Sequence, residues 1–291
     1  MSASVNTNAI FAMREVGDDL QRLRTNAGIR QEDAARKLGV TRFTVSKIER
    51  GHAFPTDSQL RTLLLLYKVS TEERAAVRAK VTQGRSYGRA WWEDKRVRTI
   101  FKGDSYRYLS LEDAAERVVT HAGTYIPGLL QTRGYVEAIA AFGQNHESTD
   151  GREAFVEARM RRQAILTRRN PVAFDGLCLE SAVRAVVGGP KTMHEQLDHL
   201  VACMTWQNVN LRVIPFSAGA PSISSASLTL LDFPGAENGS VVSEERASGE
   251  SLHEDPAEVR RGRRMLADLA AHALSPEQTL GLIKELMKEL R

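Results

Sequence analysis

The apolar positions in the first third of the chain follow a helical period. They recur three and four residues apart, at Val16, Leu20, Leu23 and Ala27. Gly28 follows them where a helix commonly ends on a left-handed glycine. This pattern predicts a helix that begins near Val16, after a flexible arm over residues 1–13.

Four more short helices are predicted in the next sixty or so residues. The second spans Gln31–Leu38 and ends at Gly39, and the third begins at the N-cap Thr41 and ends at Arg50. A fourth is capped by Asp57 or Ser58, and a fifth begins after Ser70 and ends near Gln83. Residues 14–83 are therefore expected to form a compact, all-helical domain.

A glycine-containing aromatic and basic stretch follows, and we place the domain junction there, over residues 84–103. Within it, Trp91 and Trp92 are expected to pack between domains rather than to form a ligand cage. Residues 104–170 have a helical pattern, interrupted by Tyr125–Gly128.

After Pro171 the pattern changes to short β-type runs between turn residues, at Val172–Leu179, Val209–Pro215, Ser227–Phe233 and Ser240–Glu245. Helical patterns recur at residues 191–206, 256–273 and 276–290. We therefore expect a mainly α protein whose C-terminal domain, residues 104–291, is mixed α+β, with a helical segment followed by a small mixed sheet and helices.

Composition supports two folded domains. The chain of 291 residues is 42% hydrophobic and 26% charged, which is ordinary for a globular protein. Residues 1–84 contain 14 Lys and Arg and 9 Asp and Glu, which gives a net charge of +5. The rest of the chain contains 26 Lys and Arg and 27 Asp and Glu, which gives a net charge of −1. The positive excess therefore lies in the N-terminal third, where it favours a phosphate-binding surface.

Several classes of function find no support in the sequence. The two cysteines, Cys178 and Cys203, have no spacing for a metal site or a disulfide framework, and the histidines form no metal-binding motif. No nucleotide-binding or hydrolase motif occurs. We expect no catalysis, cofactor or metal. The N-terminus resembles no signal peptide, and no apolar run is long enough to span a membrane, so a cytoplasmic protein is expected.

One stretch points to a specific chemistry. Residues 28–51 read GIRQEDAARKLGVTRFTVSKIERG, and Pro55 follows. This segment closely resembles the helix-turn-helix of the phage-repressor, or xenobiotic-response-element (XRE), family, in which a Gln opens the second helix, Leu-Gly-Val forms the turn and Ile-Glu-x-Gly ends the third. The resemblance implies a five-helix DNA-binding domain that acts on an operator in double-stranded DNA as a homodimer.

The faces of the third predicted helix agree with this role. With Val45 pointing into the core, Ile48 and Thr41 fall on the same side. The opposite side carries Phe43, Ser46, Lys47 and Arg50, with Arg42 at its edge.

The resemblance assigns roles to these side chains. It implies base contacts from Arg42, Phe43 and Lys47. It implies phosphate contacts from a second set, Gln31, Thr41, Ser46 and Arg50. In the family an arginine of the first helix pairs with the glutamate near the end of the third, so Arg24 and Glu49 are expected to stabilise the fold.

The rest of the chain also resembles a known pattern. The matching pieces are Leu111–Glu112, Tyr125–Thr132, Tyr135, Arg159 with Arg162–Gln163, Val187–Gly189, Gln196–Leu197, Val213–Pro215 and Glu245. They resemble a C-terminal domain of unknown function that is attached to this helix-turn-helix in an actinobacterial, Streptomyces-type regulator family. Members are often encoded beside a small partner protein in an antitoxin-like arrangement. The resemblance implies that the domain senses a ligand or binds a partner.

For three features of the second domain we give the interpretation that the sequence favours, together with the alternatives where it allows more than one. The arginines from Arg159 to Arg169 favour a solvated face with salt bridges, although phosphate contacts or an acidic ligand are alternatives. Ile126–Leu130 fits an apolar pocket, a partner groove or simply core. The polar stretch Ser243–Asp255 is expected to be an exposed hairpin turn and sheet edge.

The leading hypothesis is a nucleoid-associated, dimeric, sequence-specific transcriptional regulator, such as a repressor, whose second domain responds to a small-molecule effector or a protein partner. The alternative is an antitoxin-like interaction protein that sequesters a small protein encoded nearby and regulates its own operon.

Overall fold

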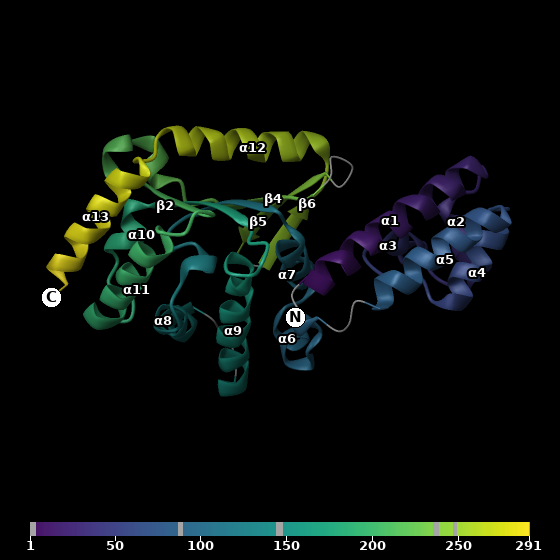
Figure 1. Ribbon diagram of the computed structural model, residues 1–291, viewed down its shortest axis with the longest axis horizontal. Coiled ribbons are helices and arrows are strands. Elements are labelled where there is room, and N and C mark those ends of the chain that lie inside the picture. Colours follow the sequence, from purple (N-terminus) through teal and green to yellow (C-terminus); the bar gives the residue numbers. More distant parts are fainter. Residues whose placement is uncertain (1–3, 87–89, 144–147, 235–238, 247–248, 291) are drawn as a thin grey trace. The chain divides into compact units, whose positions relative to one another are not determined.

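The computed structural model describes residues 4–86, 90–143, 148–234, 239–246 and 249–290 (Figure 1). The chain divides into two compact units, Met1–Ala90 and Trp91–Arg291. Residues 1–3 of the expected arm and 87–89 of the expected junction lie outside the described residues. Each unit is described by itself below.

The first unit consists of helices. They are α1 (Ser4–Asn26), α2 (Gln31–Leu38), α3 (Arg42–Glu49), α4 (Asp57–Leu66) and α5 (Thr71–Ser86). Their apolar faces enclose one core, with Leu20, Val45 and Leu64 fully buried. Thr56, rather than Asp57 or Ser58, caps α4, because its side chain accepts a hydrogen bond from the Gln59 backbone N–H.

The expected flexible arm is instead largely helical, because α1 begins at Ser4. A Cβ placed on Gly84 of α5 would lie 2.8 Å from the Cβ of Ala12, so α5 passes close to this part of α1. The helix is thus supported by a contact with a segment distant in sequence, which local periodicity cannot reveal.

The second unit is built on a mixed six-stranded sheet in the order β3-β2-β1-β4-β5-β6. The strands are β1 (Arg117–Ala122), β2 (Ala173–Leu179), β3 (Val209–Ile214), β4 (Ser227–Asp232), β5 (Ser240–Arg246) and β6 (Gly249–His253). Strands β1, β2 and β3 are parallel, whereas β4 and β5 pair antiparallel with their neighbours. The predicted mixed α+β class is confirmed.

Strand β1 corrects the sequence prediction, which placed it in a helical segment. It lies inside the sheet, parallel to β2 and antiparallel to β4. A six-residue strand between helices gives too few alternations to stand out in sequence, and pairing on both sides decides its conformation.

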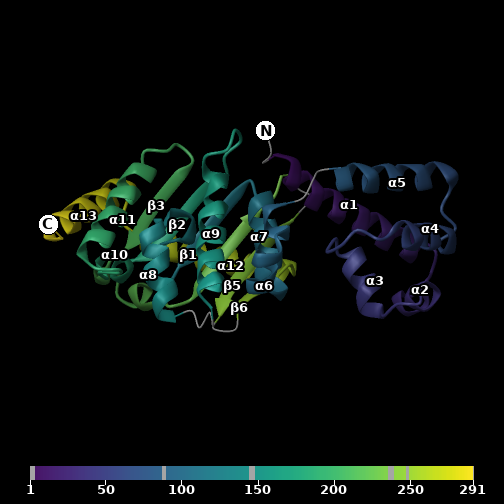
Figure 2. The ribbon, with the colours of Figure 1, turned by 90° about the horizontal axis from the view of Figure 1, so that it is seen from below.

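The α-helices of this unit are α6 (Lys95–Ile100), α7 (Gly103–Ala114), α8 (Arg133–Gly143), α9 (Thr149–Arg162), α10 (Glu180–Arg184), α11 (Pro190–Cys203), α12 (Pro256–Ala271) and α13 (Pro276–Glu289). Short 3₁₀ turns lie at Trp91–Glu93, Gly128–Leu130, Gln163–Leu166, Phe216–Ala218 and Ala220–Ile223. Helix α12 covers one face of the sheet, while α8, α9 and α11 lie on the other (Figures 1 and 2).

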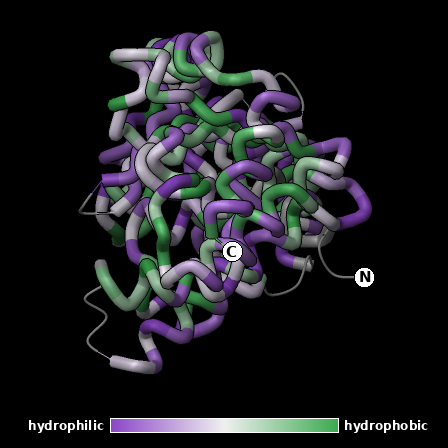
Figure 3. Tube along the Cα trace, turned by 90° about the vertical axis from the view of Figure 1, so that its left-hand side faces the viewer, coloured by the Kyte–Doolittle hydropathy of each residue, from purple (hydrophilic) through white to green (hydrophobic). Residues whose placement is uncertain are grey.

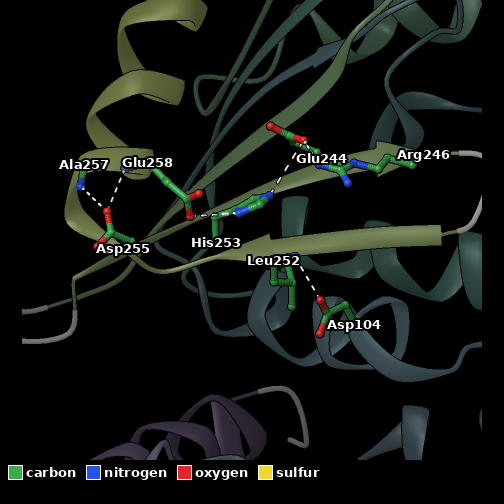
Figure 4. A network of polar contacts seen from close by, with 8 residues as sticks. All are labelled: Asp104, Glu244, Arg246, Leu252, His253, Asp255, Ala257 and Glu258. Atoms are coloured by element: carbon green, nitrogen blue, oxygen red, sulfur yellow. Dashed lines mark hydrogen bonds and ion pairs between the residues drawn. The ribbon is translucent and has the colours of Figure 1, made fainter.

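Strand β6 and the preceding strand form the expected hairpin at the sheet edge, but they are tied down (Figure 4). The Leu252 N–H donates to Asp104 of α7 over 3.1 Å, and the His253 ring contacts Glu258 of α12 at 3.0 Å. Asp255 then caps α12 by accepting from the Ala257 N–H. The described part of this polar stretch is therefore fixed between α7 and α12 rather than simply solvated.

None of the described helices is long and apolar enough to cross a membrane. Short hydrophilic and hydrophobic stretches alternate along the trace in Figure 3, as expected for elements that pack one face on a core.

Candidate nucleic-acid interface

Helices α2 and α3 are joined by a tight turn. Gly39 ends α2 in the left-handed region at φ 67°, and its N–H bonds to the Arg36 carbonyl over 3.2 Å. Thr41 then caps α3, accepting a 3.3 Å hydrogen bond from the Thr44 N–H. Two helices separated by a three-residue turn form a helix-turn-helix, as the sequence predicted.

The inner face of α3 fixes the helix on the domain. Val45 is completely buried and Ile48 is 3% exposed. Helix α1 approaches so closely that a Cβ on Gly17 would lie 2.6 Å from the Glu49 carbonyl oxygen. The position of α3 is therefore set by packing against α1 and α2.

The outer face of α3 is open to solvent. Phe43 is 77% exposed and the Arg42 side chain 67% exposed, far more than a core role would allow. Thr41, Lys47 and Arg50 are also exposed, while Ser46 is half-buried. All the side chains predicted on α3 and at its two ends thus lie together on one helix, with an aromatic ring among the cations.

A buried ion pair connects α3 to α1. Glu49 is 2% exposed, and its two carboxylate oxygens accept from Arg24 Nε at 2.6 Å and Nη2 at 3.0 Å. The hydrogen bond to Glu49 and the charge of that carboxylate raise the pKa of Arg24, although burial opposes this. The predicted Arg24–Glu49 pair is confirmed as a structural element.

Gln31 extends this network to the exposed face, which sequence reasoning missed. Its Nε2 donates to Glu49 over 2.8 Å, and its Oε1 accepts from Arg42 Nε at 3.3 Å. Arg42 Nε also lies 3.1 Å from the Glu32 carboxylate. Gln31 and Glu32 begin α2 and Arg42 begins α3, so only the angle of the turn brings them together. A phosphate contact from the Gln31 side chain would have to use its second amide N–H.

The basic helix of the second unit is not the solvated face that the sequence favoured. Arg161 and Arg169 are exposed, but Arg162 is only 11% exposed and Arg168 14%. Arg168 donates to the backbone carbonyls of Asp113 and Ala115. These two arginines turn inward because their partners lie on α7 and at its C-terminal end. Those partners are fifty or more positions away in sequence, so the sequence pattern could not reveal them.

Other chemistry is sparse in the described part of the chain. No group of His, Cys, Asp and Glu there is arranged to hold a metal ion. Both cysteines are free and buried, and burial raises the pKa of Cys178 to about 12, so its thiol stays protonated and unreactive at neutral pH.

Comparison with known proteins gives two family matches. No curated protein and no solved structure matches the chain. A model described as a helix-turn-helix domain matches residues 15–77, which contain α2 and α3. A second model, described as a domain of unknown function (DUF5753), matches residues 106–285, more than half of the chain. The chain therefore carries a helix-turn-helix domain and belongs to the DUF5753 family.

Proposed function

We propose that this protein is a transcriptional regulator that recognises a specific DNA sequence with the exposed face of α3. The observation that carries the proposal is the contrast between the two faces of this helix. Val45 and Ile48 are buried against the core of the domain, while Arg42, Phe43 and Lys47 are exposed on the other side. A rigid helix with such an outer face fits the major groove of B-DNA.

The proposed roles divide by chemistry. Arg42 donates two hydrogen bonds to the O6 and N7 of a guanine, Lys47 donates one, and Phe43 packs on thymine methyl groups. Thr41, Ser46, Arg50 and Gln31 contact phosphates and set the register of the helix on the duplex. The net charge of +5 in residues 1–84 supplies sequence-independent attraction.

We further infer that the active form is a homodimer. One helix of the length of α3 reads only a few base pairs, and a two-fold dimer reads two half-sites about one helical turn apart. The protein should therefore select an inverted repeat, and its complex with that DNA should have the mass of two chains, measured by light scattering. A monomeric complex on a single half-site would contradict this inference.

The test of the main proposal begins with selection of bound sequences from a random duplex library. Arg42→Ala should then lower affinity for the selected site by about tenfold or more, because a bidentate base contact contributes about 1–3 kcal/mol. Affinity for a scrambled duplex should change by less than about threefold, because that binding rests on phosphates. Fluorescence anisotropy at fixed salt measures both.

Arg78→Ala is the matched control, because Arg78 is an exposed arginine of α5, which packs on α1. It should leave both affinities unchanged. If Arg42→Ala weakens both duplexes equally, Arg42 is a phosphate contact. If the unchanged protein selects no sequence, the proposal fails.

A further inference from the structure

The second unit contains a cavity of about 370 Å³ on the sheet face opposite α12. The cavity lies on this face because successive side chains of a strand point to opposite faces of the sheet. Leu228, Leu230 and Val242 belong to the apolar cluster that includes Leu266 of α12, so the residues between them point the other way. Thr120, Thr229 and Ser243, neighbours on three adjacent strands, form a polar row on this side and line the cavity.

The lining of the cavity is mixed, and polar side chains make up the larger part of it. Its apolar part includes Phe155 of α9, Ile139 of α8, Ile126 and Leu129 of the loop after β1, and Phe174 of β2. A space of this size, with an apolar part and several convergent polar groups, fits a small organic molecule that has one polar and one apolar end.

Two arginines of α9 enter this space, and one is already neutralised. Arg162 donates to both oxygens of the buried Glu112, from Nε at 2.7 Å and Nη2 at 2.8 Å, and the Tyr108 hydroxyl donates to the same carboxylate. Burial alone would lower the pKa of Arg162, but the charge and hydrogen bonds of Glu112 outweigh it and raise that pKa. Arg162 thus has its counter-ion within the fold.

Arg159, one turn earlier, has no carboxylate of the described part of the chain in hydrogen-bond contact, and the charges of Glu245, Glu112 and Glu250 act on it only from a longer distance. Its Nε is buried without a hydrogen-bond partner, and among the described residues no ion pair to its guanidinium is found. Its guanidinium carbon lies 5.0 Å from the centre of the Phe155 ring, a contact that positions the charge without neutralising it. A Cβ on Gly128 would lie 2.8 Å from Arg159 Nη1, so the guanidinium lies close against this turn.

The carboxylates that also line the cavity are engaged elsewhere. Glu250 accepts a hydrogen bond from Ser243, and Glu245 is exposed and accepts from Ser227 over 3.2 Å. Burial raises the pKa of Glu250, which weakens it as a counter-ion for Arg159. A half-buried guanidinium without a bonded counter-ion is costly, so an anion that reaches it gains binding energy.

We propose that this cavity binds a small monocarboxylic acid, with its carboxylate on Arg159 and its apolar body between Phe155, Phe174 and Ile126. A planar carboxylate fits the paired N–H groups of a guanidinium. A single charge fits better than a phosphate dianion, because the carboxylate of Glu245 also borders the space. A hydroxyl or carbonyl on the acid finds partners in Thr120 and Thr229.

The experiment titrates the full-length protein with octanoate, phenylacetate and benzoate, and with the neutral amide of each acid, by isothermal titration calorimetry. At least one acid should bind saturably at one site per chain. Its amide should bind about tenfold or more weakly, because a charge-assisted hydrogen bond is lost. Arg159→Gln should reduce acid affinity to the level of the amide, and Arg159→Lys should restore part of it.

Arg161→Gln is the matched control, since Arg161 is an exposed arginine of the same helix, and it should bind like the unchanged protein. Thermal unfolding should show that Arg159→Gln stays folded, because the residue that it removes has no ion pair to lose. Equal binding of acid and amide, unchanged binding by Arg159→Gln, or no binding of any acid at millimolar concentration would each overturn the proposal. None of these results depends on DNA binding.

Discussion

Glu49 shows how a single buried residue can support a surface. Its carboxylate receives two hydrogen bonds from Arg24 and one from Gln31, and Gln31 in turn contacts Arg42. The interior pair therefore also restrains, through Gln31, the guanidinium group of Arg42, which is proposed to read DNA.

Glu49→Ala should destabilise the first unit by about 3–5 kcal/mol, because it leaves the Arg24 charge buried and unpaired. Urea denaturation followed by circular dichroism measures the loss. Glu32→Ala removes an exposed carboxylate and should change stability by less than about 0.5 kcal/mol. A similarly small effect of Glu49→Ala would mean that the Arg24 pair contributes little.

Substitution of Arg50 and substitution of Arg42 should differ in their effect on the salt dependence of DNA binding. Arg50 lies at the C-terminal end of α3 and is proposed to contact a phosphate. Arg50→Ala should weaken specific and scrambled duplexes alike and reduce the slope of log affinity against log salt by about one per bound chain. Anisotropy titrations at several salt concentrations measure the slope, and a sequence-dependent loss would instead make Arg50 a base contact.

At the scale of elements, the approach of α1 to α3 depends on Gly17. Its missing Cβ would lie 2.6 Å from the Glu49 carbonyl oxygen and 2.7 Å from the Gly51 nitrogen, and both are backbone atoms that cannot turn aside. Gly17→Ala should therefore cost about 2 kcal/mol or more in unfolding free energy. Gly281→Ala in α13 has nothing within 4 Å and should instead stabilise by up to about 1 kcal/mol. Thermal denaturation compares the two, and equal effects would show that α1 and α3 are not in close contact.

Strand β1 places His121 inside the sheet, where burial lowers its pKa to about 4. Its Nδ1 lies 2.8 Å from the Ala226 carbonyl oxygen, and its Nε2 is buried without a hydrogen-bond partner. The site therefore favours the neutral ring, because a proton added to make the ring cationic would have no acceptor at Nε2. The pKa in the unfolded chain is about 6.5. Between these values the unfolded state binds more protons, so the His121 contribution is complete above pH ~6.5 and is lost as the pH falls towards ~4.

The His121 contribution over that range is about 3 kcal/mol at most. His121→Gln should make the unfolding free energy less dependent on pH between about 4 and 6.5. Identical pH profiles for the unchanged protein and His121→Gln would show that His121 does not titrate in this way.

At the scale of the whole molecule, the two units have separate cores. The apolar cluster of the first unit runs from Val16 to Val81, and those of the second lie beyond residue 91. Calorimetry should therefore show two unfolding transitions. Leu177→Ala leaves a cavity at a buried position of the sheet and should lower the midpoint temperature of the second unit's transition only. Glu49→Ala should lower the midpoint temperature of the first unit's transition only. A single transition shifted by both variants would show that the units unfold together.

The sequence by itself determined the first unit closely. Periodicity, Thr41 and Gly39 located α2 and α3, because these signals are local. The Arg24–Glu49 pair spans 25 positions and was expected only from the family resemblance. In the second unit, short β-type runs located β2 to β5, and helical periodicity located α12 and α13, because these signals are local too.

Only the tertiary structure decided the remainder. It extended α1 to Ser4, placed β1 inside the sheet and turned Arg159 and Arg162 inward. A charge run has the same sequence whether it faces water or a cavity, and what distinguishes the two is a partner such as Glu112, fifty residues away. Long-range packing fixes the environment of a side chain, whereas its neighbours in sequence fix little more than its backbone.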